Sequence, residues 1–208
     1  ISIPAESPQP DSTTPLTIDE ANDNLTISGA NGLKIEFNKR NGTIEHYKIK
    51  DIVLIDQPVQ LQFWRAIVDN ERVLSTNPGI PRDWKEALKG SQMTHYKLTK
   101  TEDGGLLIDS TIELSQVHST VGLQYTLFPD GEIEIAMSLQ MPPVKKIKKH
   151  SHPYKQFDNI SRPRRIGMEF RLPNKLQNIR WYGQGPHATY IDRNYERIGL
   201  FSGTVDAQ

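Results

Sequence analysis

The stretch that decides the fold is TVGLQYTLFPDGEIEIAMSLQM, residues 120–141. Its apolar side chains occupy every second position on both sides of the centre, namely Val121, Leu123, Tyr125 and Leu127, then Ile133, Ile135, Met137, Leu139 and Met141. A period of two puts alternate side chains on one face of a pleated strand. Pro129, Asp130 and Gly131 separate the two runs and favour a turn. The stretch is therefore predicted to be an antiparallel β-hairpin.

The same alternation recurs upstream, where Leu33, Ile35 and Phe37 share one face of a predicted strand. The dipeptides Asn31-Gly32 and Asn41-Gly42 on either side are typical of tight turns between antiparallel strands. Roughly ten such strands fit the chain, and they favour an all-β antiparallel sandwich over a parallel α/β fold.

A helical pattern is confined to PRDWKEALKG, residues 81–90. Pro81 suits the first position of a helix and Gly90 suits its stop, while Trp84, Ala87 and Leu88 share one side. The segment therefore predicts one short helix.

Residues 1–20 contain four prolines and many small polar side chains, which disfavour a regular hydrogen-bonded element. They are predicted to be a linker from a preceding domain, and residues 21–208 are predicted to form the sandwich. The segment 142–163 interrupts the alternation and predicts a long exposed loop.

The composition of the 208-residue chain argues against several classes of function. Its 25 basic and 25 acidic side chains cancel, so the long-range field that gathers nucleic acid or an anionic membrane is missing. The absence of cysteine removes disulfides, thiolate metal sites and cysteine nucleophiles. We therefore expect no nucleic acid and no membrane as partners, and no metal or other cofactor in this chain.

One candidate for chemistry follows the apolar run LQFWRAIV, where Asp69, Asn70 and Glu71 stand together. A pair of carboxylates is what a glycosidase uses, one as acid and one as nucleophile or base. On residue types alone, two carboxylates this close in a loop favour a solvated turn.

The other candidate is WYGQGPHATYIDR, residues 181–193. Gly183, Gly185 and Pro186 predict a tight bend after a strand. Asp192 and Arg193 then suit the role of tying the next segment to backbone groups or to each other.

An alternative interpretation of the same stretch is a sugar contact. Trp181 or Tyr182, or Trp64 in the earlier run, has the flat apolar surface that stacks on a pyranose ring. The residue types fit both a structural corner and a ligand contact.

Four segments together resemble one family: FWRAIVDNE (63–71), DWKEA (83–87), RIGMEFRLP (165–173) and WYGQGPHATYIDR (181–193). They are similar to signatures of the C-terminal β-sandwich of family-2 glycoside hydrolases, specifically the β-galactosidases. The resemblance runs from about residue 22 to the end. It implies a large antiparallel supersandwich of the galactose mutarotase type, incomplete at its C-terminal end.

The resemblance also implies where the chemistry lies. In that family a central barrel carries two catalytic glutamates, and the sandwich packs beside it and shapes the active-site rim. This chain is then expected to hold no catalytic residue, to have the barrel and other domains of its parent as partners, and to meet the galactoside only through the parent. Mg or Na in the parent, and either the cytoplasm or the periplasm as compartment, are compatible with the resemblance.

Residue by residue, the resemblance places Asp69, Asn70, Glu71 and Arg72 near the active-site mouth, as candidates for contact with substrate or barrel. It assigns Gly183, Gly185, Pro186, Tyr190, Asp192 and Arg193 to a structural turn. The chain departs from the family pattern at Glu71, where Asp is usual, and at Ala188-Thr189, where Glu-Asn is usual.

Three further hypotheses remain open at this point. The first is that the sandwich acts as a carbohydrate-binding module with a weak site of its own. The second is that it acts as a mutarotase that uses His95, His118 and Glu169. The third concerns assembly: an uncovered sheet edge is expected to drive self-association of the fragment.

Overall fold

A computed structural model of the chain describes residues 14–66, 83–142, 163–189 and 193–207. Strands and their turns make up most of these residues, and the helices among them are short 3-10 turns. The chain divides into two compact units, Ile1–Arg171 and Leu172–Gln208. No helix in the described ranges is long and apolar enough to cross a bilayer.

One layer of the first unit is a five-stranded antiparallel sheet in the order β1-β2-β3-β4-β5. Its strands are β1 (Thr17–Ala21), β2 (Asn24–Ser28), β3 (Lys34–Asn38), β4 (Thr43–Ile49) and β5 (Ile52–Ile55). Leu33, Ile35 and Phe37 are all buried, as their alternation predicts. The turns predicted on either side are present, with the left-handed backbone at Asn31, Gly32 and Gly42.

The linker predicted for residues 1–20 differs from the structure at its C-terminal end. Thr17–Ala21 form β1, which pairs with β2 in an antiparallel ladder from Thr17 opposite Ser28 to Ala21 opposite Asn24. Leu16 is buried just before this strand, and its N–H donates a hydrogen bond of 2.9 Å to the carbonyl of Gly104. Burial of Leu16 and the β2 ladder therefore outweigh the linker-like composition upstream.

The other layer is a four-stranded antiparallel sheet in the order β10-β9-β8-β7. Its strands are β7 (Gln92–Lys100), β8 (Leu106–Leu114), β9 (Ser119–Leu127) and β10 (Ile133–Gln140). The hairpin predicted from residues 120–141 is confirmed: Tyr125 lies opposite Ile135, and Val121 lies opposite Leu139. The apolar row of β9 is fully buried, whereas that of β10 is half-buried because β10 stands at the end of the sheet.

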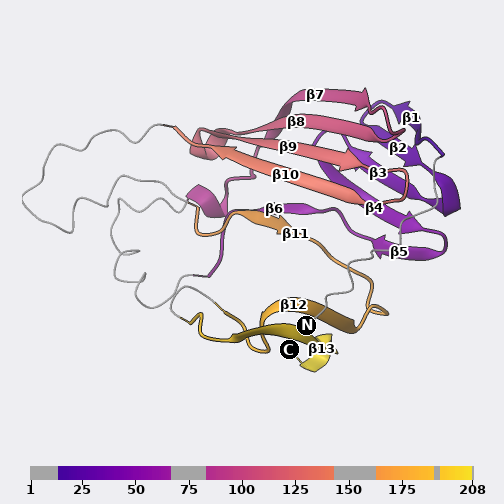
Figure 1. Cartoon of the computed structure of the whole chain (residues 1–208). Coiled ribbons are helices and arrows are strands. Elements are labelled where there is room, and N and C mark those ends of the chain that lie inside the picture. The colour runs from indigo at the N-terminus through magenta and orange to yellow at the C-terminus, as the bar shows by residue number, and fades with distance from the viewer. Residues whose placement is uncertain (1–13, 67–82, 143–162, 190–192, 208) are drawn as a thin grey trace, which may run out of the picture. The chain divides into compact units, whose positions relative to one another are not determined.

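The two sheets face each other across one apolar core, as Figure 1 shows for β1–β5 and β7–β10. The rings of Phe37 and Tyr125 meet edge to face with centroids 5.5 Å apart. The hydroxyl of Tyr125 donates a hydrogen bond of 3.1 Å to the carbonyl of Gly42. The hydroxyl of Tyr47 similarly donates to the carbonyl of Gly131 in the β9–β10 turn. The all-β antiparallel sandwich predicted from the sequence is confirmed.

A two-stranded ribbon also belongs to this unit, formed by β6 (Gln60–Gln62) and β11 (Gly167–Glu169). Leu61 lies opposite Met168, and the Nε2 of Gln62 donates a hydrogen bond of 3.0 Å to Oε2 of Glu169. Because Leu61 and Met168 both pack on the core, the ribbon is anchored to the sandwich through its apolar face.

The helix predicted over residues 81–90 is not formed in the described part of that segment. A single 3-10 turn, η2 (Asp83–Lys85), precedes hydrogen-bonded turns up to Gly90. Trp84 and Ala87 are buried as predicted, but Leu88 is exposed. The residues between Pro81 and Gly90 are too few to repay the cost of helix nucleation, so burial of the Trp84 ring decides the local backbone.

The second unit contains one hairpin of β12 (Asn178–Gly185) and β13 (Arg197–Thr204). Trp181 lies opposite Phe201, and Tyr182 lies opposite Leu200. The 3-10 turn η5 (Val205–Ala207) follows β13, and the N–H of Val205 donates to the carbonyl of Gln177.

Candidate functional site

The candidates for contact with substrate or barrel, Asp69, Asn70, Glu71 and Arg72, lie outside the described residues. Their described neighbour Phe63 is buried, and its ring packs on Trp84 with centroids 5.5 Å apart. The N–H groups of Arg164 and Arg165 both donate to the Phe63 carbonyl. The chain therefore enters the candidate rim segment from an anchored backbone.

Trp64 follows this anchor. Its side chain is partly buried and packs against the core of the sandwich. The side chain therefore contributes part of its surface to packing, which leaves less of the ring for stacking on a sugar.

Trp181, a second stacking candidate, lies on one face of the β12–β13 hairpin. Its ring stacks on Phe201 with centroids 5.4 Å apart and an interplanar angle of 28°. The guanidinium carbon of Arg197 lies 5.7 Å from the centroid of the Phe201 ring. Because Phe201 covers one face of the indole, a sugar would meet the other face or the edge.

The glycines on this face differ from their predicted role. Gly183 and Gly185 were predicted to bend the chain, but both lie inside β12, opposite Gly199 and Arg197. A Cβ atom at Gly185 would come within 3.0 Å of the Phe201 ring. Glycine therefore favours the close approach of an aromatic ring there, and the bend follows Gly185, at Pro186 and His187.

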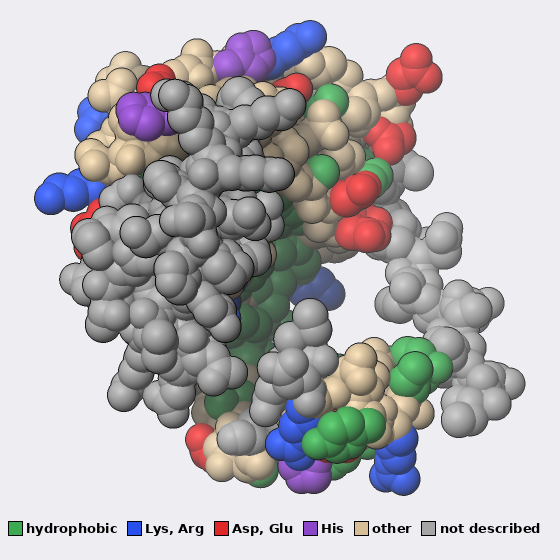
Figure 2. Space-filling model, turned by 90° about the vertical axis from the view of Figure 1, so that its left-hand side faces the viewer, with side chains coloured by type: hydrophobic (Ala, Val, Ile, Leu, Met, Phe, Trp, Pro, Cys, Tyr) green, Lys and Arg blue, Asp and Glu red, His purple; other side chains and the backbone are tan. Residues whose placement is uncertain are grey.

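The opposite face of the hairpin carries Tyr182, the third stacking candidate. Its side chain is 56% exposed and lies opposite Leu200, which is 53% exposed, with Ile198 beside them. In the unit 172–208, Figure 2 shows hydrophobic side chains on the surface beside basic and histidine side chains. Tyr182, Leu200 and Ile198 together form an exposed apolar strip.

A polar cluster of His187, Arg193 and Glu196 lies in the connection between β12 and β13. Oε1 of Glu196 lies 3.2 Å from Nδ1 of His187 and 3.3 Å from a terminal nitrogen of Arg193. Arg193 was predicted to bind backbone groups or Asp192, and its contact in the described residues is instead with the side chain of Glu196. Asp192 and Tyr190, the other members of the predicted turn, lie outside the described residues.

Sequence reasoning missed Glu196, Phe201 and Arg197, because their roles depend on pairing across the hairpin. A local signal does exist, since the apolar residues at 198, 200 and the aromatic at 201 follow a strand pattern. Nothing in the sequence gives the register with β12.

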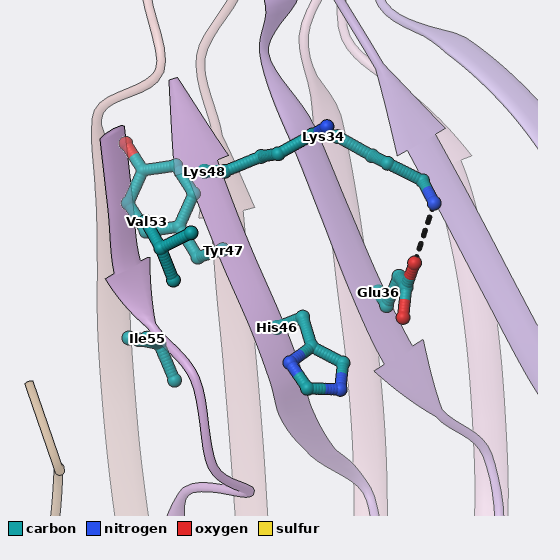
Figure 3. A pocket seen from close by; sticks show the side chains of 7 residues that line it. All are labelled: Lys34, Glu36, His46, Tyr47, Lys48, Val53 and Ile55. Atoms are coloured by element: carbon teal, nitrogen blue, oxygen red, sulfur yellow. Dashed lines mark hydrogen bonds and ion pairs between the residues drawn. The ribbon is translucent and has the colours of Figure 1, made fainter. Parts of the chain in front are cut away.

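A cleft of about 310 Å³ lies on the outer face of the five-stranded sheet. Its lining residues come from β3, β4 and β5 and are Lys34, Glu36, His46, Tyr47, Lys48, Val53 and Ile55. Figure 3 shows Lys34 turned toward Glu36, with the His46 ring on the next strand and Val53 and Ile55 on the strand beyond. Sequence analysis did not single out these residues, although Lys34 and Glu36 alternate with the buried Ile35 and Phe37.

The three residues considered for a mutarotase are not joined in the structure. His95 lies on β7, His118 lies in the turn before β9, and Glu169 lies on β11 with hydrogen bonds from Gln62 and Arg171. Within the described ranges no hydrogen bond or ion pair links the three. Nor do any three His, Asp or Glu side chains of these ranges form a group that could ligate a metal ion.

The first unit is an all-β sandwich, and the second unit contains a β-hairpin with aromatic residues on its surface. Residues 29–208 match the family described as the beta galactosidase small chain, and the chain belongs to this family. The resemblance inferred from the sequence motifs is thereby confirmed.

Curated relatives agree with the family match. The β-galactosidase of Priestia megaterium is 29% identical over 196 residues, which cover 93% of this chain and 17% of the relative. The β-galactosidase of Clostridium acetobutylicum is 24% identical, over 87% of this chain and 18% of the relative. That of Vibrio cholerae is 22% identical, over 88% of this chain and 18% of the relative. The chain thus spans less than a fifth of the length of these relatives.

Proposed function

We propose that the chain is the non-catalytic C-terminal sandwich of a β-galactosidase, which shapes the rim of an active site built by other domains. The parent would hydrolyse terminal non-reducing β-D-galactose residues. The observation that carries the proposal is the uneven coverage of the match: 93% of this chain aligns with only 17% of a relative named a β-galactosidase. The residues of this chain then account for a small part of such an enzyme.

The tight packing of the described sandwich is consistent with a non-catalytic role, in which the domain positions the rim of the active site. Leu123 and Tyr125 have no exposed surface, and one continuous apolar core fills the space between the sheets. The contribution to rate would come from positioning the segment 69–72 and excluding water at the rim of the barrel. In the parent, two close carboxylates would act by a retaining mechanism.

A chromogenic β-galactoside tests this proposal. The chain alone is expected to give no turnover above buffer. A chimera of the Priestia megaterium β-galactosidase, with this chain in place of the matching segment, is expected to hydrolyse the substrate, whereas deletion of that segment abolishes hydrolysis. Turnover by the chain alone that disappears in Glu169→Gln or Glu196→Gln would overturn the non-catalytic role.

A second candidate function is weak carbohydrate binding by the hairpin, favoured by the exposure of Tyr182 and the surface position of Trp181. Galactose or lactose would stack on one of these rings. Titration of tryptophan fluorescence with millimolar sugar is expected to saturate, and removal of the stacking ring, by Trp181→Ala or Tyr182→Ala, is expected to remove the response. A linear response, or one that both substitutions leave intact, would reject this candidate.

We also infer self-association through β10. Within the described residues β10 has a partner strand on one side only, and Glu134 is its single charged side chain. Pairing of two copies about Met137 would place Glu134 opposite Gln140 and Ile135 opposite Leu139, with no like charges facing each other.

A further inference from the structure

We propose that the cleft on the outer face of β3, β4 and β5 binds a small organic anion, with its oxyanion head between Lys34, Lys48 and His46 and its apolar body against Val53 and Ile55. The inference goes beyond the proposed function and does not depend on it. It uses none of the residues assigned to the active-site rim or to sugar stacking.

The pairing of β3 with β4 creates an excess of positive charge in the cleft. Lys34 lies directly opposite Lys48, and Glu36 lies directly opposite His46. Like charges that face each other across two strands are destabilising. Two ammonium groups therefore stand against one carboxylate in the cleft, and a bound anion would relieve their repulsion.

Glu36, the single carboxylate that lines the cleft, already forms an ion pair. Nζ of Lys34 lies 2.5 Å from Oε1 of Glu36, in an ion pair whose side chains are both partly exposed. The side chains of Lys48 and His46 make no hydrogen bond or ion pair with any other described residue. Positively charged or chargeable groups thus remain available on β4 at the mouth of the cleft.

The pKa of Glu36 reflects the positive charge of the basic groups around it. The hydrogen bond from Lys34 lowers the pKa of the Glu36 carboxyl below its usual value, and the charges of Lys34, His46 and Lys48 lower it further. A carboxylate placed among these groups is therefore stabilised in its charged form. An external carboxylate or phosphate near Lys48 would be attracted by the same basic groups, against a partial repulsion from the charged Glu36.

The apolar lining of the cleft, Val53 and Ile55, would contact the apolar body of the ligand. Val53 lies opposite Lys48, and Ile55 lies opposite Tyr47, with a β-bulge between the two pairs. Val53 is partly buried and Ile55 is buried in the core, and both line the cleft that holds the charged groups. A volume of about 310 Å³ is near the lower end of ligand pockets, which suits a compact molecule such as an aromatic acid.

The test uses the 208-residue chain and two-dimensional amide NMR. Benzoate and phenyl phosphate provide the two kinds of oxyanion head, and benzamide provides the same ring without charge. Benzoate, phenyl phosphate or both are expected to shift amide signals of residues 34–36, 46–48 and 53–55 in a saturable manner at millimolar concentration. Whichever anion binds more tightly identifies the head group, and benzamide is expected to give no saturable shift.

Variants separate a built site from general attraction to basic side chains. Lys48→Gln is expected to weaken binding about tenfold, as for the loss of one charge-assisted contact. Glu36→Gln, which removes the competing carboxylate and frees Lys34, is expected to tighten binding. Lys97→Gln, an equal charge change on an exposed position of β7, is the matched control and is expected to have no effect.

Three results would overturn the proposal. One is the lack of a saturable shift with both anions. Another is an equal response to benzamide, which would mean that charge plays no part. The last is equal weakening by Lys97→Gln and Lys48→Gln, which would mean that the ligand senses only the net charge of the chain.

Discussion

The hydroxyl of Tyr125, near the C-terminal end of β9, donates a hydrogen bond of 3.1 Å to the carbonyl of Gly42, in the turn before β4. The bond is buried and joins the two sheets of the sandwich. A buried carbonyl that loses its donor costs free energy, because water does not replace the missing partner.

Tyr125→Phe is therefore expected to lower the free energy of unfolding by about 1 kcal/mol. Tyr96→Phe is the matched variant, since the Tyr96 hydroxyl is buried and has no hydrogen-bond partner in the described structure. Urea unfolding of both variants measures the difference. A loss of stability in Tyr96→Phe as large as that in Tyr125→Phe would contradict the assigned role of the Tyr125–Gly42 bond.

Alkaline pH is expected to destabilise the fold. Burial, together with a smaller effect of the charge of Glu20, raises the pKa of Tyr96 to about 12, and burial also raises the pKa of Tyr125. An unfolded tyrosine ionises near pH 10. Because the folded state holds these protons more tightly, the stabilisation is complete below about pH 10 and is lost as pH rises toward 12.

Chemical unfolding at a series of pH values measures this loss. Tyr96→Phe is expected to flatten the decline between about pH 10 and 12, because the variant lacks one of the shifted groups. An unchanged slope in that variant would contradict the raised pKa of Tyr96.

The β9–β10 turn requires glycine at position 131. Its backbone φ is +96°, and a Cβ atom there would lie 2.9 Å from Cδ1 of Ile49. Gly90 also has a positive φ, of +72°, but a Cβ atom there would meet no atom within 4 Å. Gly90→Ala is expected to cost about 1 kcal/mol from backbone strain alone, and Gly131→Ala roughly 2 kcal/mol or more. Thermal unfolding compares the two, and a larger loss for Gly90→Ala would count against this explanation.

The aromatic stack of the hairpin depends on Gly185. Gly185→Ala would bring Cβ within 3.0 Å of Phe201 and 3.2 Å of Nε1 of Trp181, whereas Gly183→Ala would meet only Cδ1 of Trp181, at 4.0 Å. Gly185→Ala is therefore expected to weaken the near-ultraviolet circular dichroism of the Trp181–Phe201 pair. Gly183→Ala is expected to preserve the signal, and equal effects of the two substitutions would refute the steric account.

Sedimentation velocity tests the inferred pairing through β10. A lysine on an exposed edge strand opposes strand addition. Ser138→Lys is expected to shift the distribution toward monomer. Thr99→Lys is the matched control, because β7 is the other end of the same sheet and already carries Lys97 and Lys100. A wild-type chain that remains monomeric across micromolar concentrations would contradict the inference.

Much of the sandwich was predictable from local pattern. The alternation from Val121 to Leu127 and the turn at Gly131 specify the β9–β10 hairpin without knowledge of the rest of the chain. The helix predicted around Trp84 was wrong, because burial of that ring beside Phe63 decides the backbone of a short segment. That contact joins residues whose proximity no local pattern reveals.

The sites were less predictable than the fold. Glycine at 185 is ambiguous in sequence, since a bend and a close aromatic contact both require it, and only the pairing with β13 reveals Phe201. In the cleft, Lys34 and Lys48 have outward positions that alternation predicts, but their meeting depends on the register of β3 with β4. A bulge between Glu36 and Phe37 shifts that register by a step that side-chain periodicity alone does not give.

The two tyrosine hydrogen bonds between the sheets have a consequence for biosynthesis. They join residues that are 83 and 84 positions apart, so the sheet of β1–β5 leaves the ribosome long before its covering layer exists. At roughly 5–20 residues per second, translation of the intervening stretch takes about 4 to 17 seconds. During that interval Ile35, Phe37 and Ile44, which are buried in the finished fold, are exposed to solvent on the nascent polypeptide. Chaperones that bind exposed apolar segments during translation are therefore expected to bind it.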